Sequence, residues 1–132
     1  MVDLAQHSGD GLVTLKDIAA RQELSQKYLE QIVTQLSKAG LVKGTRGPQG
    51  GYRLARAPKE YNVAEILELV EGSLAPVECL EADVNTCERC SSCATIDMWS
   101  GLYKVVTDYL GNITLEDMVQ RANAAAGNDY MI

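Results

Sequence analysis

The sequence predicts a mainly α-helical fold with one small β-hairpin: a winged helix-turn-helix followed by a long dimerisation helix. Three observations predict it. Two short amphipathic segments separated by a tight turn fill residues 15–39. Two β-prone runs flanking a glycine-rich turn follow directly, in residues 41–55. Farther along, residues 96–110 repeat apolar side chains at alternating spacings of three and four, which is the pattern of a helix that packs along another helix.

Length and composition suit one small domain, or one domain with an appendage. The chain has 132 residues, and 46% of them are hydrophobic, which is enough for a core. It contains no run of 18 apolar residues that could span a membrane, and its N-terminus lacks the basic and apolar regions of a secretory signal. We therefore expect a cytoplasmic protein without a membrane partner.

Charge is divided unevenly along the chain. Residues 1–59 hold nine basic and five acidic side chains, a net charge of +4, whereas residues 60–132 hold three basic and thirteen acidic ones, a net charge of −10. The overall charge of −6 argues against nucleic-acid binding only if the chain is treated as uniform. The division instead suggests a basic binding module joined to an acidic body, and a solvated acidic face is the simpler alternative.

The first two elements expected are short helices. Residues 1–7 have the pattern of the end of a helix, which the turn-forming run 8–11 stops. Thr14 then begins a second helix as its N-cap, because its hydroxyl can accept a hydrogen bond from the backbone N–H near Asp17. This second helix is expected to end near Gln22.

A third helix is expected over residues 26–39, with Ser25 as its N-cap and Gly40 at its end. Its apolar residues, at positions 29, 32, 33 and 36, follow the spacing of a single buried face. Long polar side chains that can read base edges in a major groove lie on or beside the other face: Gln26, Lys27, Glu30 and Gln31. Two helices joined by a tight turn predict a helix-turn-helix, although an ordinary helical hairpin with a solvated face fits the same pattern.

A β-hairpin directly after the third helix favours the DNA-binding interpretation. Leu41–Thr45 and Tyr52–Ala55 are the β-prone runs, and the turn Arg46–Gly51 between them is rich in glycine. This arrangement predicts a wing, with Arg46 as the one charged side chain at its tip. An arginine on a thin loop suits a narrow minor groove, whose negative potential attracts it. A nucleotide-binding loop is not predicted, because no helix start with Lys-Ser or Lys-Thr follows the glycines.

All four cysteines fall within fifteen residues at the spacing C-x7-C-x2-C-x2-C; they are Cys79, Cys87, Cys90 and Cys93. The residues between them are largely polar, so this segment is poor material for a core. Thiolates are soft ligands that suit zinc and iron–sulfur clusters, and disulfides are rare in a reducing cytosol. We expect a metal centre held by these four residues. The alternatives are disulfides, a reversible thiol switch or inert cysteines.

Three helices are expected around the cysteine segment. Asn62 caps a supporting helix that Gly72 ends. After Cys93 a long helix runs to about residue 110 and carries an apolar stripe, namely Ile96, Trp99, Tyr103, Val106 and Leu110. The stripe predicts a helix that packs against its copy in a dimer, and a core-facing stripe within one chain is the alternative. Thr114 caps a last short helix to about residue 124, and an irregular tail follows.

Three runs carry a resemblance to a known family: Leu24–Gln31, Leu36–Val42 and Arg46–Tyr52. The motifs Tyr-Leu-Glu-Gln and Arg-Gly-x-x-Gly-Gly-Tyr within them are highly specific. With further matches at Trp99 and Ile113–Asp117, the chain resembles the Rrf-two family of bacterial winged-helix transcription regulators over nearly its whole length. The resemblance implies a homodimer that binds a palindromic operator in double-stranded DNA. No enzyme is expected, since no set of Ser, His and Asp suited to catalysis is apparent in the sequence.

The resemblance also assigns site residues by position. Those that match the DNA side of the recognition helix and the wing are Ser25, Lys27, Tyr28, Glu30, Gln31 and Arg46. To these we add Gln26 from the same helix, and Gly47 and Gln49 from the wing.

Among the iron–sulfur members of the family, three ligand cysteines correspond to Cys79, Cys87 and Cys93. The histidine that is the fourth ligand in IscR-like members falls on Ile96, and the aspartate of NsrR-like members would lie upstream of Met1. Cys90 is the additional thiol that can replace them or be a spare. Members of the family usually begin about fourteen residues earlier, with a basic segment that touches DNA. The alternatives here are a misassigned start, a trimmed chain or a protein that lacks this segment, and only the last predicts weaker phosphate contacts.

The expected organisation has three parts. Residues 1–72 form the DNA-binding winged helix-turn-helix, residues 73–93 the cysteine-rich sensor loop, and residues 94–132 the dimerisation helix and the C-terminal helix. The expected function is transcription regulation in response to iron–sulfur or redox status, through a cluster that we favour as 2Fe–2S over 4Fe–4S. One alternative is a cluster-free, CymR-like regulator of cysteine and sulfur metabolism that uses thiol oxidation, zinc or a cysteine-biosynthesis enzyme as its input. Another is an interaction module without DNA binding.

Overall fold

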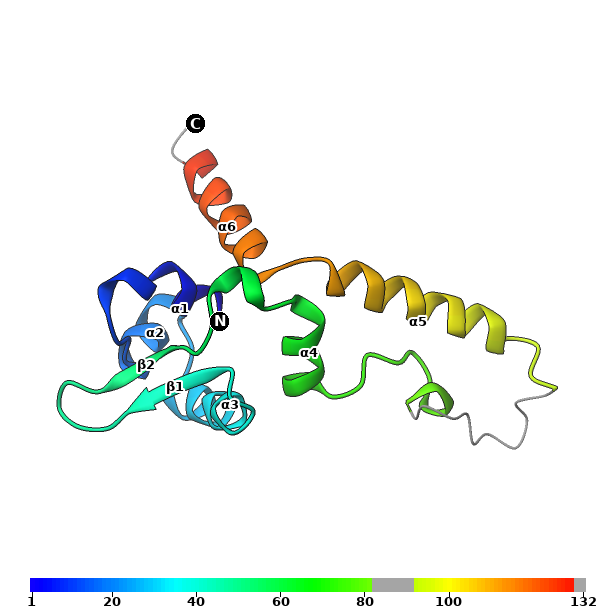
Figure 1. Cartoon of the computed structure of the whole chain (residues 1–132), viewed down its shortest axis with the longest axis horizontal. Helices are drawn as coiled ribbons and strands as arrows, with labels where there is room; N and C mark the ends of the chain where they lie inside the picture. The colour runs from blue at the N-terminus through cyan, green and yellow to red at the C-terminus, as the bar shows by residue number, and fades with distance from the viewer. Residues whose placement is uncertain (82–91, 130–132) are drawn as a thin grey trace.

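The elements follow one another in the order of a winged helix-turn-helix with a long helical extension. The computed structural model describes residues 1–81 and 92–129. Its helices and strands are α1 (Val2–Gln6), α2 (Leu15–Gln22), α3 (Gln26–Lys38), β1 (Val42–Thr45), β2 (Gly51–Leu54), α4 (Val63–Glu71), α5 (Ile96–Gly111) and α6 (Leu115–Asp129). Figure 1 shows α1–α3 and the hairpin at one end of the molecule and α5 reaching to the opposite end, with α4 between them. No described helix is both long enough and apolar enough to cross a membrane.

Side-chain caps begin the helices where the sequence predicts. Thr14, Ser25 and Asn62 each accept a hydrogen bond from the backbone N–H three residues farther on, over 2.9–3.1 Å. Each bond satisfies one of the N–H groups that a helix start leaves without an intrahelical partner. The bend between α2 and α3 lies at Glu23, whose φ of 54° is in the left-handed region that residues other than glycine seldom adopt. This detail of the helix-turn-helix turn had no signal in the sequence.

One hydrophobic core joins the helices to the hairpin, and it includes Leu4, Ile18, Val33, Leu36, Val42 and Leu115. Tyr61 is 1% exposed and connects three parts of this core. Its hydroxyl donates to the carbonyl of Leu41 over 2.5 Å and accepts from the N–H groups of Ala55 and Arg56 over 3.0 and 2.9 Å. The turn after α3 and the end of β2 are therefore held by one side chain.

The start of α6 belongs to the same core. Leu115 is 2% exposed, and its N–H donates to the carbonyl of Tyr61 over 3.0 Å. The N–H of Val63 donates to the carbonyl of Ile113 over 2.9 Å, so the chain on both sides of α4 and α5 is tied together. The predicted end of this helix near residue 124 was too early, because α6 continues to Asp129 through a run of alanines that favours helix.

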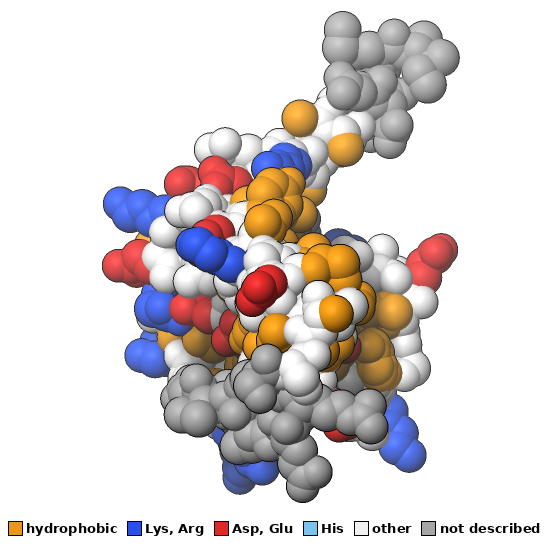
Figure 2. Space-filling model, turned by 90° about the vertical axis from the view of Figure 1, so that its right-hand side faces the viewer, with side chains coloured by type: hydrophobic (Ala, Val, Ile, Leu, Met, Phe, Trp, Pro, Cys, Tyr) orange, Lys and Arg blue, Asp and Glu red, His pale blue; other side chains and the backbone are white. Residues whose placement is uncertain are grey.

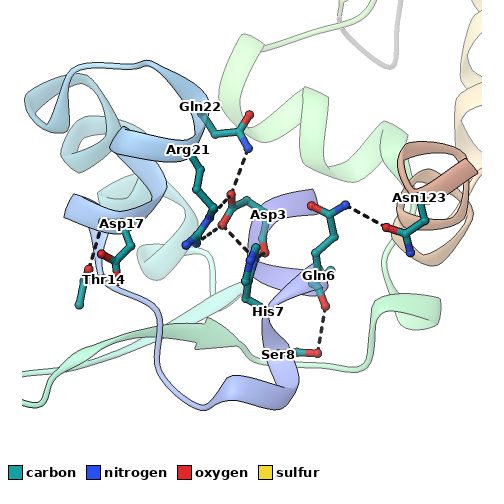
Figure 3. A network of polar contacts seen from close by, with 10 residues as sticks. Asp3, Gln6, His7, Ser8, Thr14, Asp17, Arg21, Gln22 and Asn123 are labelled. Carbon is teal, nitrogen blue, oxygen red and sulfur yellow. Dashed lines mark hydrogen bonds and ion pairs between the residues drawn. The ribbon is translucent and has the colours of Figure 1, made fainter. Parts of the chain in front are cut away.

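A buried carboxylate connects α1 to α2 (Figure 3). Asp3 is 7% exposed and accepts two hydrogen bonds from the Arg21 guanidinium, over 2.7 Å from Nη2 and 3.0 Å from Nε. Gln22 Nε2 donates to the same carboxylate over 3.0 Å, and His7 Nδ1 lies 3.5 Å from it. The Arg21 hydrogen bonds, against the opposing effect of burial, hold the pKa of Asp3 below its ordinary value. The last turn of α2, just before the bend at Glu23, is thereby fixed to α1.

Helix α5 has two apolar faces rather than one. The predicted stripe from Ile96 to Leu110 is half-buried within the same chain, as the core-facing alternative required, and α4 is the helix that packs on α5. A second set lies on another face at spacings of four, three and four, and it remains exposed: Met98, Leu102, Val105 and Tyr109. We call this second set the open stripe. Figure 2 looks at the molecule from the N-terminal end of α5 and shows hydrophobic side chains gathered across the middle of this side of the molecule.

Candidate nucleic-acid interface

Helix α3 presents its polar face to solvent because its apolar face is fixed in the core. Leu29, Val33 and Leu36 are 3–8% exposed. The residues predicted from this helix to meet DNA are all exposed: Gln26, Lys27, Tyr28, Glu30 and Gln31. Tyr28 is 52% exposed, so a large aromatic ring stands on the surface beside hydrogen-bonding side chains. The structure thus brings these five predicted residues together on one surface helix.

Ser25 is predicted both to cap α3 and to contact DNA, and the structure shows the first of these roles. Its Oγ accepts from the N–H of Tyr28 over 3.0 Å and so caps α3. A hydroxyl that accepts through a lone pair keeps its proton for donation to another acceptor. Ser25 can therefore cap the helix and still donate to a ligand at the helix start.

The wing is a two-stranded antiparallel hairpin in which Val42 pairs with Leu54 and Thr45 with Gly51. The end of β2 next to the tip is pinned by a bridge to Val13, whose N–H and carbonyl exchange hydrogen bonds with Tyr52 over 2.9 and 2.7 Å. Gly51 is required by this close approach, because a Cβ there would lie 2.8 Å from the carbonyl oxygen of Val13. The wing is therefore held, close to its tip, against the segment that precedes α2.

The tip of the wing holds the three residues predicted for it, Arg46, Gly47 and Gln49, and all are exposed. Gly47 has a φ of 115°, a conformation open to glycine and strained for other residues. A hollow of about 510 Å³ lies between the tip and the end of α3, and Arg46 and Ser37 are among the residues that line it. Of α3, only Ser37 lines this hollow, so the hollow adjoins the end of the recognition helix and not residues 26–31.

The stretch that contains the wing carries a higher density of positive charge than the division of the chain into halves suggested. Residues 31–59 contain six basic side chains and no acidic one. One of the six, Arg56, is engaged: it donates to Glu65 over 2.7 Å and lies 4.3 Å from the ring centre of Tyr61. The other five are exposed and make no ion pair within the described part of the chain; they are Lys38, Lys43, Arg46, Arg53 and Lys59. A count over this shorter window would have shown the signal in the sequence.

Of the predicted metal ligands, only Cys79 and Cys93 are within the described residues; Cys87 and Cys90 are outside them. Cys79 is half-buried in the single 3-10 turn Glu78–Leu80. Cys93 is half-buried just before α5, with its Sγ 3.4 Å from Thr95 Oγ1. Figure 1 places both ends of this segment at the side of the molecule away from the wing. Among the described residues, no group of three His, Cys, Asp or Glu is arranged to hold a metal.

In chain order, helix α4 lies between the recognition helix and the cysteine segment. It packs on α3 on one side and on α5 on the other. A hollow of about 250 Å³ separates its last turn from α3, lined by Tyr28, Gln31, Gln35, Val70 and Glu71 among others. The segment that leads to Cys79 starts at the end of α4, so one helix lies between that segment and the hollow that Tyr28 and Gln31 line.

Comparison with known proteins gives consistent matches over most of the chain. The model of the Rrf2 family, the Rrf-two family named above, is described as an iron-dependent transcriptional regulator and matches residues 1–121. The HTH-type transcriptional regulator IscR of Pectobacterium carotovorum is 40% identical over 119 residues, which cover 90% of this chain and 71% of that protein.

Two solved structures share both sequence and fold with the chain. IscR of T. potens is 44% identical with a TM-score of 0.73, and the match covers 94% of this chain and 80% of that one. CymR, the global cysteine regulator of B. subtilis, is 37% identical with a TM-score of 0.74, and the match covers 91% of this chain and 87% of that one. The chain therefore resembles regulators with two different names to a similar degree.

Proposed function

Because the chain belongs to the Rrf2 family of transcriptional regulators, which are not enzymes, we propose that it binds DNA through α3 and the wing as a homodimer. We further propose that the state of its cysteine segment controls this binding. The observation that carries the proposal is an exposed polar recognition helix followed directly by a wing without acidic residues, whose basic side chains are exposed. Lys and Arg side chains on such a surface attract the phosphate backbone regardless of sequence.

Side chains on α3 supply the sequence-reading contacts. Gln31 and Gln26 can each pair with an adenine edge, Lys27 with guanine, and Glu30 with the amino group of cytosine. The Tyr28 ring can cover a thymine methyl. Arg46, at the tip of a hairpin that the bridge to Val13 holds close to the tip, suits a narrow minor groove beside the half-site.

The test is selection of bound duplexes from a random pool, followed by fluorescence anisotropy with the selected duplex. Gln31→Ala should lower affinity for the selected duplex by roughly 5- to 100-fold and relax preference at one base pair. Arg46→Ala should also lower the affinity, and it should relax the base preference at a different position of the duplex from Gln31→Ala. Gln120→Ala, on the exposed side of α6, is the matched control and should bind as the parent does. Failure to enrich any sequence, with Gln31→Ala indistinguishable from the control, would contradict the proposal.

The homodimer is supported by the open stripe of α5. Four large apolar residues stay exposed in a heptad-like pattern on a helix that reaches away from the core, an arrangement that suits packing against a second copy. Leu102→Glu or Val105→Glu should shift the protein to monomers in sedimentation velocity experiments. Ser100→Glu, on another face of α5, places the same charge outside the stripe and should leave the mass unchanged.

The residues proposed to hold an iron–sulfur cluster are Cys79 and Cys93, together with Cys87 and Cys90 from outside the described residues. Half-buried sulfur donors at both ends of the segment fit such a group, and a cluster supplies sensitivity to iron and oxidants. Ile96 offers no donor at the position of the IscR-like histidine, so the fourth ligand falls to Cys90. Cys79 and Cys93 would then tie the end of α4 to the start of α5.

The absence of a donor at Ile96, together with the similarity to CymR, keeps a cluster-free thiol or zinc switch as the second candidate. An absorbance spectrum of protein purified without oxygen, with iron, sulfide and zinc assays on the same sample, separates the candidates. Visible bands with stoichiometric iron and sulfide, lost in Cys93→Ser, support the cluster. A colourless protein that resists reconstitution removes it, and one zinc per chain identifies a zinc site.

A further inference from the structure

The wing carries a pair of basic residues directly opposite each other on its solvent face. In the hairpin register Lys43 pairs with Arg53. Side chains alternate along a strand, and the neighbouring pair Val42 and Leu54 faces the core, with Val42 2% exposed. Lys43 and Arg53 are both exposed, and neither makes an ion pair within the residues that the structure describes.

Such a pair is unfavourable for the free protein. Like charges directly opposite across two strands destabilise a hairpin, and no acidic residue occurs between positions 31 and 59 to offset them. Arg56, in contrast, has both Glu65 and the Tyr61 ring as partners. The outer face of the wing therefore holds two positive charges for which the described chain supplies no counter-charge.

We propose that Lys43 and Arg53 form a phosphate-binding site that holds the DNA backbone beside the groove entered by Arg46. This inference rests on the proposed DNA-binding function and extends its contact surface. The planar guanidinium of Arg53 can bind two phosphate oxygens at once, and the Lys43 ammonium acts as a point charge beside it. Phosphate is thus the ligand chemistry that this pair fits.

Position along the wing favours a DNA backbone over an acidic protein surface. Lys43 precedes Arg46 by three residues on the same hairpin arm, which is about 10 Å at the rise of an extended strand. Measured along the DNA helix axis, that length corresponds to about three base-pair steps. With Arg46 in the minor groove, Lys43 and Arg53 would lie within reach of phosphates on its edge.

The experiment measures the affinity of the full chain for a fluorescein-labelled duplex of mixed sequence, about 40 base pairs long, between 50 and 200 mM salt. The slope of log affinity against log salt is negative, and each lost phosphate contact reduces its magnitude by about 0.9. Lys43→Gln and Arg53→Gln together should lower it by about 1.8, so affinity should fall about 12-fold less over this range than in the parent protein. The melting temperature should stay equal or rise, because a repulsive pair has been removed.

The matched control is Lys104→Gln with Arg121→Gln, which changes net charge equally at exposed positions outside the proposed DNA-binding surface. It should leave the salt slope unaltered. A Lys43/Arg53 variant with the slope of the parent overturns the inference alone, and it would assign the pair to an acidic protein surface instead. A parent chain that binds no duplex at low salt overturns both the inference and the proposed function.

Discussion

Replacement of Asp3 by Asn tests whether a buried ion pair holds the helix-turn-helix in place. Asp3 is 7% exposed and has two hydrogen bonds from Arg21 and one from Gln22. Removal of one partner from a buried pair costs about 3–5 kcal/mol. Arg21 is 35% exposed and can turn toward water, and the Asn oxygen retains one hydrogen bond, which reduces our figure to about 2 kcal/mol. The melting temperature should fall by roughly 5–10 °C for a chain of this length.

The assay is thermal and urea unfolding followed by circular dichroism, at one fixed protein concentration so that assembly does not shift the midpoint. Because the folded-state pKa of Asp3 is lowered, its stabilisation is complete above the ordinary pKa and is lost as pH falls through the folded-state value. The difference between the parent and Asp3→Asn should therefore be full at pH 7 and shrink in acid.

Asp10→Asn provides the control, since Asp10 is exposed and makes no ion pair among the described residues. It should change the free energy of unfolding by less than about 0.5 kcal/mol. If Asp3→Asn unfolds at the temperature of the parent, or if the gap between them stays constant down to strong acid, the carboxylate does not act as argued here.

Two other substitutions test the parts that support the wing. Tyr61→Phe should cost about 1 kcal/mol in urea unfolding, because the N–H of Arg56 loses its acceptor in a part-buried site, whereas Ala55 keeps a second bond to the carbonyl of Leu41. An unchanged midpoint would refute this role. Gly51→Ala should cost about 1–3 kcal/mol, because its Cβ would strike the backbone of Val13, whereas Gly127→Ala in exposed helix should stabilise by roughly 0.5–1 kcal/mol; equal signs for the two would contradict the close approach.

Local sequence signals were sufficient for the winged helix-turn-helix itself. Caps at Thr14, Ser25 and Asn62, the apolar face of α3 and the glycine-rich turn of the wing each act within a few residues of the chain. The structure confirms all of them. The bend at Glu23 escaped prediction because no glycine marks its left-handed conformation.

Contacts between residues distant in sequence left no such signal. The partners of Tyr61 and of Asp3 lie up to 20 residues away, so neither periodicity nor capping rules indicate them. For α5 the limit is different. Both of its apolar faces obey the same spacing, and the sequence prediction named only the stripe from Ile96 to Leu110, with no signal for which face packs within the chain. Only the fold, by covering the stripe from Ile96 to Leu110, identifies the open stripe as the free one.

The anchoring of α5 limits how a signal at the cysteines could reach DNA. Ile113 and Leu115, just past its C-terminal end, are 8% and 2% exposed in the core of the winged helix, while its N-terminal end adjoins Cys93. A helix of 16 residues is about 24 Å long. A shift of about 2 Å at the cysteine end would thus turn α5 by about 5° around residues 111–114. In the proposed dimer the open stripe lies on this same helix, so that turn would change the distance between the two recognition helices. Half-sites are read one DNA turn apart, and a small change in that distance is sufficient to favour or oppose binding.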